Sequence, residues 1–250
     1  MHPAHELLLL LILVLHIALP LGSWALLRGY RDSAAQLWVL GIGIYCAGTI
    51  LAAFNTASYS HIKFTLMALM YLASILLMLE ALLRDLTERR RHPLVFGGAL
   101  LGGALYFSAI ALHDLYATVG LMSISLLFLT FGLTGIALTR QLLRRDHSRG
   151  MGLITFAMLL MVSGHVLRLS KMALGASPAE FQVTSYTWNS NYLVITTVIT
   201  LILCAFGYWG YVMDKMGKKN QLMQAQKISS EMAAQEAAFA TRSLQQRIAD

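Results

Sequence analysis

The sequence contains little charge for its length. Only 12% of its 250 residues are Asp, Glu, Lys or Arg, whereas an ordinary soluble domain has about 25%. Hydrophobic residues make up 57% of the chain, and the mean hydropathy is +0.63. Low charge combined with long apolar runs excludes an ordinary soluble domain and indicates an integral membrane protein.

Cysteine and proline are also scarce. The two cysteines, Cys46 and Cys204, both fall inside apolar runs. The sequence therefore predicts no disulfide framework, and we interpret both as small buried apolar side chains. Among the four prolines, Pro20 lies within the first apolar run, where we expect it to kink a helix.

Several signatures of known activities are missing. The sequence has no P-loop, no glycine-rich nucleotide-binding motif and no Ser/His/Asp arrangement that its spacing supports. The last apolar run has no lysine before Lys215, so a retinal Schiff base in the middle of that helix is not expected. We expect no cofactor and no catalytic residue within these 250 residues.

Seven apolar runs each approach the length that crosses a bilayer, about 20 residues of helix. The expected spans are Glu6–Leu27, Leu37–Asn55, Phe64–Leu83, Pro93–His113, Val119–Thr139, Met151–Leu174 and Asn191–Met213. The first run is too long for the apolar core of a signal peptide, and no basic segment precedes it, so we interpret it as a retained helix. The sequence predicts an all-α integral membrane protein, with a seven-transmembrane-helix bundle at residues 1–216 and a cytoplasmic signalling helix, or stalk, at residues 217–250.

Lysine and arginine are concentrated in alternate linkers. The linkers after the first, third, fifth and seventh spans contain Arg28, Arg31, Arg84, Arg89, Arg90, Arg91, Arg140, Arg144, Arg145, Arg149, Lys215, Lys218 and Lys219. The opposite linkers contain Lys63. Because cytoplasmic loops are enriched in lysine and arginine, we expect the N-terminus outside and the C-terminus in the cytoplasm. With this orientation, the net charge of +7 follows from the topology and attracts the chain to anionic inner-leaflet lipid. It does not indicate a nucleic-acid partner.

The sixth span carries basic side chains in its second half, in the segment HVLRLSK at residues 165–171. Arg168 is expected about 25 Å along this helix, near its outer end, with His165 one turn deeper and Lys171 one turn shallower. Snorkelling of long side chains toward the interface is one interpretation. The other is a site, because polar groups within a span usually face the bundle interior.

Polar residues from other spans are expected at the same depth. The candidate ligand-binding residues are His165, Arg168, Lys171, Asn55, His113, Asp114 and Asn191. They predict a partly basic pocket in the outer half of the bundle, where Arg168 holds a carboxylate or phosphate or pairs with an acidic side chain. The long outer linker at residues 176–191 is interpreted as a lid.

Metal and haem binding are weaker alternatives. The sequence places His2, His5, His61 and His113 on the outer side. No two of them lie four residues apart on a helix, so we expect no metal site. A haem would require His16 and His165 to face each other, and a lone helical histidine is more often a hydrogen-bonded core residue.

Two spacings predict packing inside the bundle. Gly98 and Gly102 are four residues apart, with Gly97 and Gly103 beside them, and Gly43 and Ala47 repeat this spacing, with Gly48 directly after them. Small residues at this spacing let helices approach closely, so we expect intramolecular seams there, with dimerisation as the alternative. Glu80 precedes Arg84 by four residues, which predicts a helical ion pair.

The stalk is rich in helix-forming residues. Leu222, Ala225, Ser229, Met232, Glu236 and Phe239 recur at intervals of three and four, and Ala237, Thr241, Leu244 and Ile248 continue in a shifted register. This pattern predicts a coiled-coil-like helix that changes phase and pairs with a second copy of the chain; an ordinary amphipathic linker is the alternative. No stop signal precedes Asp250, so we expect an output domain to follow.

This organisation resembles the seven-helix N-terminal membrane region of bacterial sensor histidine kinases. The resemblance rests on the seven spans, the basic inner linkers and the stalk at residues 222–250, not on sequence motifs. It implies a multi-pass sensor in the bacterial inner membrane that binds a small molecule and signals through a kinase in a two-component system. The alternatives are the sensor of a diguanylate cyclase and a small-solute transporter or channel. The expected partners are a small-molecule ligand, membrane lipid and a second copy of the chain, with no nucleic acid.

Overall fold

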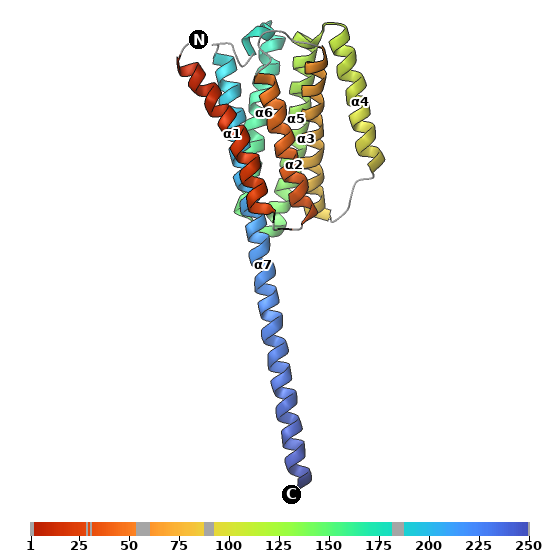
Figure 1. The fold of residues 1–250 in the computed structure, drawn as a ribbon, viewed down its shortest axis with the longest axis vertical. Coiled ribbons are helices and arrows are strands. Elements are labelled where there is room, and N and C mark those ends of the chain that lie inside the picture. Colours follow the sequence, from red (N-terminus) through yellow and green to blue (C-terminus); the bar gives the residue numbers. More distant parts are fainter. Residues whose placement is uncertain are drawn as a thin grey trace. The chain divides into compact units, whose positions relative to one another are not determined.

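A computed structural model describes residues 3–28, 30, 32–53, 61–87, 93–181 and 188–249. The elements, in chain order, are α1 (Pro3–Leu27), α2 (Ser33–Ala53), α3 (His61–Thr87), α4 (Pro93–Leu112), the π-helix η1 (Tyr116–Gly120), α5 (Leu121–Asp146), α6 (Arg149–Ala173), the 3-10 helix η2 (Pro178–Phe181) and α7 (Trp188–Ala249). These described residues contain no β-strand, which confirms the predicted all-α class (Figure 1).

All seven α-helices are long and apolar enough to cross a membrane. Their most apolar windows have mean hydropathies of 1.6 to 2.2. Large apolar side chains point away from the bundle, including Leu105 on α4, which is 67% exposed, and Phe156 on α6, which is 55% exposed. Lipid tails cover such side chains without penalty, because lipid is as apolar as they are. The chain is therefore a multi-pass membrane protein with seven spans, as predicted.

The chain divides into two compact units, Met1–Gly210 and Tyr211–Asp250. We call the first the bundle and the second the stalk unit. Because α7 runs without a break from Trp188 to Ala249, both the division at Gly210 and the boundary predicted at residues 216–217 fall inside one helix.

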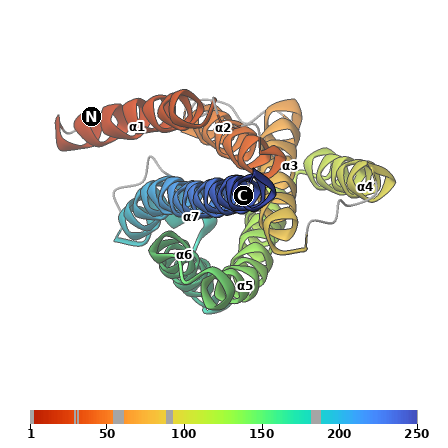
Figure 2. The ribbon, with the colours of Figure 1, turned by 90° about the horizontal axis from the view of Figure 1, so that it is seen from below.

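Within the bundle, consecutive helices pack on one another from α1 to α4, and α5 returns to pack on α3 and α6. α1 packs on α2, α2 on α3, and α5 on both α3 and α6, while α4 packs on the outer side of α3 (Figure 2). The bundle part of α7 contacts both α2 and α6. The Tyr208 ring stacks on Trp38 of α2 with centroids 4.4 Å apart, and the Thr200 hydroxyl donates to the Ala157 carbonyl of α6 at 3.3 Å.

The α-helices run alternately in opposite directions through the bundle (Figure 1). We call the end at which α1, α3 and α5 finish the basic end, because Arg84 lies in the last turn of α3 and Arg144 and Arg145 lie in the last turn of α5, and we call the other the distal end. At the basic end, His147 adopts a left-handed conformation with φ of 49° and ends α5, and Ser148 caps α6 by accepting from the Gly150 amide at 3.2 Å. α5 ends at Asp146, seven residues beyond the predicted end of this span at Thr139, because the basic last turns of the helix stay helical.

Close helix approaches involve other glycines than the predicted Gly98/Gly102 and Gly43/Ala47 seams. A Cβ at Gly207 of α7 would lie 2.8 Å from the Gly150 carbonyl oxygen of α6. By contrast, Cβ atoms at Gly43, Gly98 and Gly102 would meet nothing within 4 Å. The prediction of intramolecular seams at these three glycines is wrong. α4 packs on α3 through the neighbouring face that carries Gly103, where a Cβ would meet Leu72, and α2 packs on α3 at Gly48, where a Cβ would lie 3.3 Å from Tyr71 Cε1.

The basic end is held by polar contacts within α3 and between helices. The predicted ion pair is confirmed, with Arg84 Nε 2.8 Å from Glu80 Oε1. The buried Asp85 carboxylate accepts from the Tyr208 hydroxyl at 2.9 Å, and Arg145 of α5 donates to the Asp85 carbonyl at 2.8 Å. Trp38 and Tyr208 are fully buried, so they belong to the core.

Candidate functional site

Among the candidate residues that the structure describes, His165 lines an internal cavity. This cavity, which we call the core cavity, measures about 20 Å³. Its lining residues are Tyr45 of α2, Phe128 of α5, Met161, Gly164 and His165 of α6, and Leu193, Thr196, Thr197 and Thr200 of α7. Four helices thus enclose a small space that has hydroxyl groups on the α7 side and an imidazole on the α6 side.

The His165 imidazole is fixed by stacking. Its ring lies 5.0 Å from the Phe128 ring with an interplanar angle of 13°. Phe128 in turn makes edge contacts with Tyr45 at 6.0 Å and with Tyr71 at 5.2 Å. The Nδ1 atom of His165 is buried and has no hydrogen-bond partner. A buried polar atom without a partner carries a desolvation cost of about 1–3 kcal/mol, so this atom marks a place where a ligand or water is expected.

The second mid-bundle histidine occupies a different place in the same aromatic cluster. His16 is 2% exposed, and its Nδ1 lies 2.7 Å from the Ile12 carbonyl oxygen. Its ring lies 6.4 Å from that of Tyr45, whereas His165 stacks on Phe128. The two imidazoles therefore stack on different rings.

Two of the three cavity-lining threonines on α7 use their hydroxyl hydrogens within the protein. Thr196 donates to the Tyr192 carbonyl at 2.8 Å and shares the same hydrogen with the Leu193 carbonyl at 3.0 Å. Thr200 donates across to α6, to the Ala157 carbonyl. Because a hydroxyl has one hydrogen and two lone pairs, both oxygens keep lone pairs that can accept a hydrogen bond.

Arg168 lies one turn beyond His165, toward the distal end. Its guanidinium carbon is 5.7 Å from the centroid of the Phe181 ring, a distance typical of a cation–π contact. Phe181 belongs to η2 in the α6–α7 linker and is 6% exposed. Phe181, in the part of this linker that the structure describes, therefore packs on the bundle. Lys171, a further turn along, is exposed.

The remaining candidates are spread over the distal end. Asp114 sits in a left-handed turn after α4 with φ of 54°, and its Oδ1 lies 3.9 Å from His61 Nε2, with both side chains largely exposed. His113 is exposed and Asn191 half-buried. Asn55 lies outside the described residues. The structure thus describes two groups, His165 with Arg168 on α6 and Asp114 with His61, and the described residues contain no cluster of three or more His, Cys, Asp or Glu suited to a metal ion.

Sequence reasoning did not single out the neutral residues of the core cavity. Thr196 and Thr200 are four residues apart on α7 and share a helix face, which is visible in the sequence. Uncharged threonines are frequent in membrane helices, however, and the association of Tyr45 and Phe128 with them depends on how distant helices pack.

No protein-family model, curated protein or solved structure matches this chain.

Proposed function

We propose that the protein is the membrane sensor module of a bacterial signal-transduction protein. In this proposal a small ligand binds the distal half of the bundle, and α7 passes the signal to the stalk unit. The observation that carries the proposal is the dual role of α7. The same uninterrupted helix supplies the threonine wall of the core cavity and the whole of the stalk unit.

The α6 residues define the ligand class. Arg168 presents a planar guanidinium suited to two parallel hydrogen bonds with a carboxylate or phosphate, and it lies against the buried Phe181 ring. Lys171 adds a second cation one turn away. We propose a small anionic ligand with an apolar part, recognised by Arg168, Lys171 and His165, with His113, Asp114, Asn191 and Asn55 contributing from the distal linkers.

The basic end supports the orientation. Arg84 lies in the last turn of α3, and Arg144 and Arg145 lie in the last turn of α5. Because lysine and arginine prefer cytoplasmic loops, they support a proposed orientation in the inner membrane with the distal end and the N-terminus outside and the C-terminus in the cytoplasm.

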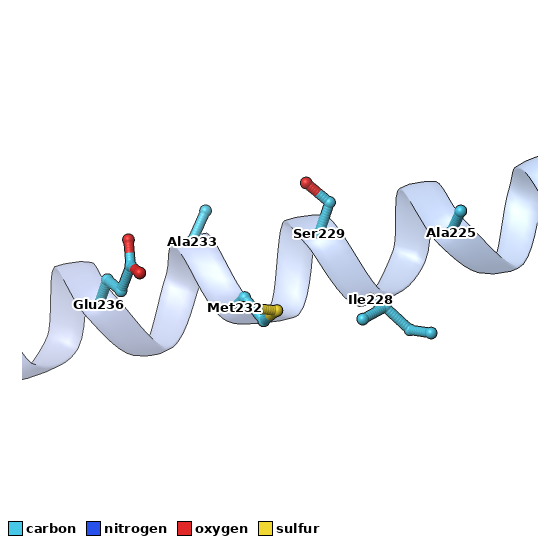
Figure 3. Close-up of a pocket in the computed structure, with 6 residues that line it drawn as sticks. All are labelled: Ala225, Ile228, Ser229, Met232, Ala233 and Glu236. Carbon is cyan, nitrogen blue, oxygen red and sulfur yellow. The ribbon is translucent and has the colours of Figure 1, made fainter.

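The exposed face of the stalk supports pairing with a second copy. Figure 3 shows Ala225, Ile228, Ser229, Met232, Ala233 and Glu236 on one helix segment. Ile228 and Met232 are 58% and 57% exposed. The opposite face carries an exposed ion pair between Lys227 and Glu231 at 3.8 Å. An apolar stripe backed by charge is typical of a coiled-coil helix. The predicted phase change falls partly on Leu244 and Ile248, whose side chains lie outside the description.

The proposed output is a histidine kinase in a two-component phosphorelay. A ligand shifts the pairing of two stalks only when it binds the two bundle arrangements with different affinity. The kinase activity would belong to an output domain joined to the stalk; a diguanylate cyclase is the alternative output for the same arrangement.

Ligand binding is tested with the purified chain in nanodiscs. A panel of small carboxylates and phosphates is screened by thermal unfolding, where a ligand at 100 times its Kd stabilises the protein by about 2.7 kcal/mol. We expect Arg168→Ala to lose this stabilisation. The matched control is Arg140→Ala, because it removes the same charge from an exposed position at the basic end. Equal stabilisation of wild type and Arg168→Ala by every active compound would contradict the proposed site.

Stalk pairing is tested separately by disulfide cross-linking in native membranes. Ser229→Cys and Met232→Cys lie on the exposed apolar face and are expected to form covalent dimers. Ala234→Cys lies near the centre of the opposite face and is expected to cross-link poorly. Equal cross-linking at the three positions, or none at any of them, would argue against a paired stalk.

A further inference from the structure

The core cavity has a buried nitrogen atom without a hydrogen-bond partner in its wall, and it has room for a small molecule that could bond to this atom. His165 Nδ1 is buried without a partner, and its imidazole lines the cavity together with three threonines of α7. A cavity needs a volume of about 10–15 Å³, open to a sphere of the size of water, to hold one water molecule, and the water needs two to four polar partners. The volume of about 20 Å³ meets the first condition, and the polar lining meets the second.

The distribution of donors and acceptors selects the occupant. Thr196 and Thr200 have committed their hydroxyl hydrogens to backbone carbonyls, so each offers only lone pairs to the cavity. A neutral imidazole with its hydrogen on Nε2 would likewise offer only a lone pair at Nδ1. A molecule that bridges two acceptors must donate two hydrogen bonds, and water does so at a size that fits.

We propose that the core cavity is a binding site for one ordered water molecule that bridges His165 on α6 to the threonine hydroxyls on α7. The water corrects the deficit at Nδ1, and it joins α6 to α7 by an adjustable link next to the direct bond from Thr200 to the Ala157 carbonyl. This inference concerns the free protein and does not depend on the sensory role.

The packing around Gly164 provides a way to alter the site. A Cβ at this position would lie 3.2 Å from Thr196 Oγ1 and 3.5 Å from Leu193 Cδ2, both in cavity-lining residues. Gly164→Ala therefore adds a methyl group at the cavity wall. On the same helix, a Cβ at Gly152 would meet nothing within 4 Å, so Gly152→Ala is the matched control.

The test uses the full chain, labelled with ¹⁵N-histidine, in detergent micelles or nanodiscs. The His165 signals are assigned by their loss in His165→Phe, which retains a ring against Phe128, or through correlation with Gly164 if that variant does not fold. We expect a long-lived water to give a nuclear Overhauser peak to the His165 ring protons, and Nδ1 to resonate as a hydrogen-bonded, unprotonated nitrogen. Gly164→Ala is expected to lose the water peak, and Gly152→Ala to retain it.

Three outcomes would overturn the proposal. The first is an Nδ1 signal typical of a nitrogen without a hydrogen bond, together with no water peak, which would mean a dry cavity. The second is a scalar coupling across a direct bond from Nδ1 to a protein group. The third is a water peak that persists unchanged in Gly164→Ala, which would place the water elsewhere. A ligand screen that finds no compound would leave all three outcomes unaffected.

Discussion

The buried bond between Tyr208 and Asp85 is the contact whose loss should most clearly destabilise the basic end. The carboxylate is 6% exposed and the tyrosine is fully buried, and the donor–acceptor distance is 2.9 Å. Hydrogen bonds to charged groups contribute about 1.5–3 kcal/mol. Tyr208→Phe removes the donor but keeps the ring that stacks on Trp38 at 4.4 Å, so we expect a loss of about 1.5–3 kcal/mol in the free energy of unfolding.

The assay is equilibrium unfolding in mixed micelles, with a double-mutant cycle. If the two groups bond each other, Tyr208→Phe and Asp85→Asn together should cost clearly less than the sum of the single changes. Tyr106→Phe is the control, because the Tyr106 hydroxyl lies 2.7 Å from Ser123 Oγ at an exposed position, where we expect a change within about 0.5 kcal/mol. A Tyr208→Phe variant as stable as wild type, or strictly additive effects, would refute the reasoning.

Further predictions concern the helix contacts. Gly207→Ala should destabilise the bundle by about 1–3 kcal/mol, because the methyl group would meet Ile154 Cγ1 at 2.7 Å and the Gly150 carbonyl; unfolding titrations measure this, and a neutral result would contradict the close approach. Gly102→Ala should be neutral or stabilising by up to about 1 kcal/mol, and a clear loss would show that a partner covers that face. Arg145→Met should lower stability by about 0.5–1.5 kcal/mol, because it removes donors to two carbonyls at the end of α3; thermal unfolding checks this, and an unchanged midpoint would count against it.

The seven helices followed directly from the sequence, because each apolar run must satisfy its own backbone hydrogen bonds inside lipid. The Glu80–Arg84 pair followed in the same way, since both residues lie on one helix. Such local regularities need no knowledge of how the helices pack.

The contacts between helices did not follow. The spacing of Gly98 and Gly102 places them on one face of α4 but does not say which face α3 covers. α3 covers the face that carries Gly103. Trp38 lies near the membrane boundary in the sequence pattern, where a belt residue and a core residue look alike, and its stacking partner Tyr208 is on the last helix. The core cavity depends on uncharged threonines, which charge-based reasoning passes over.

The central proposal is that the distal end of the bundle and the stalk lie on opposite sides of the membrane. Single cysteines at Ser177, in the α6–α7 linker, and at Ser229, in the stalk unit, test it in intact cells with a membrane-impermeant maleimide. The native Cys46 and Cys204 are 1% and 3% exposed, so they should contribute little background labelling. The proposal predicts labelling of Ser177→Cys in intact cells and of Ser229→Cys only after permeabilisation. Labelling of both variants in intact cells, or of both only after permeabilisation, would contradict it.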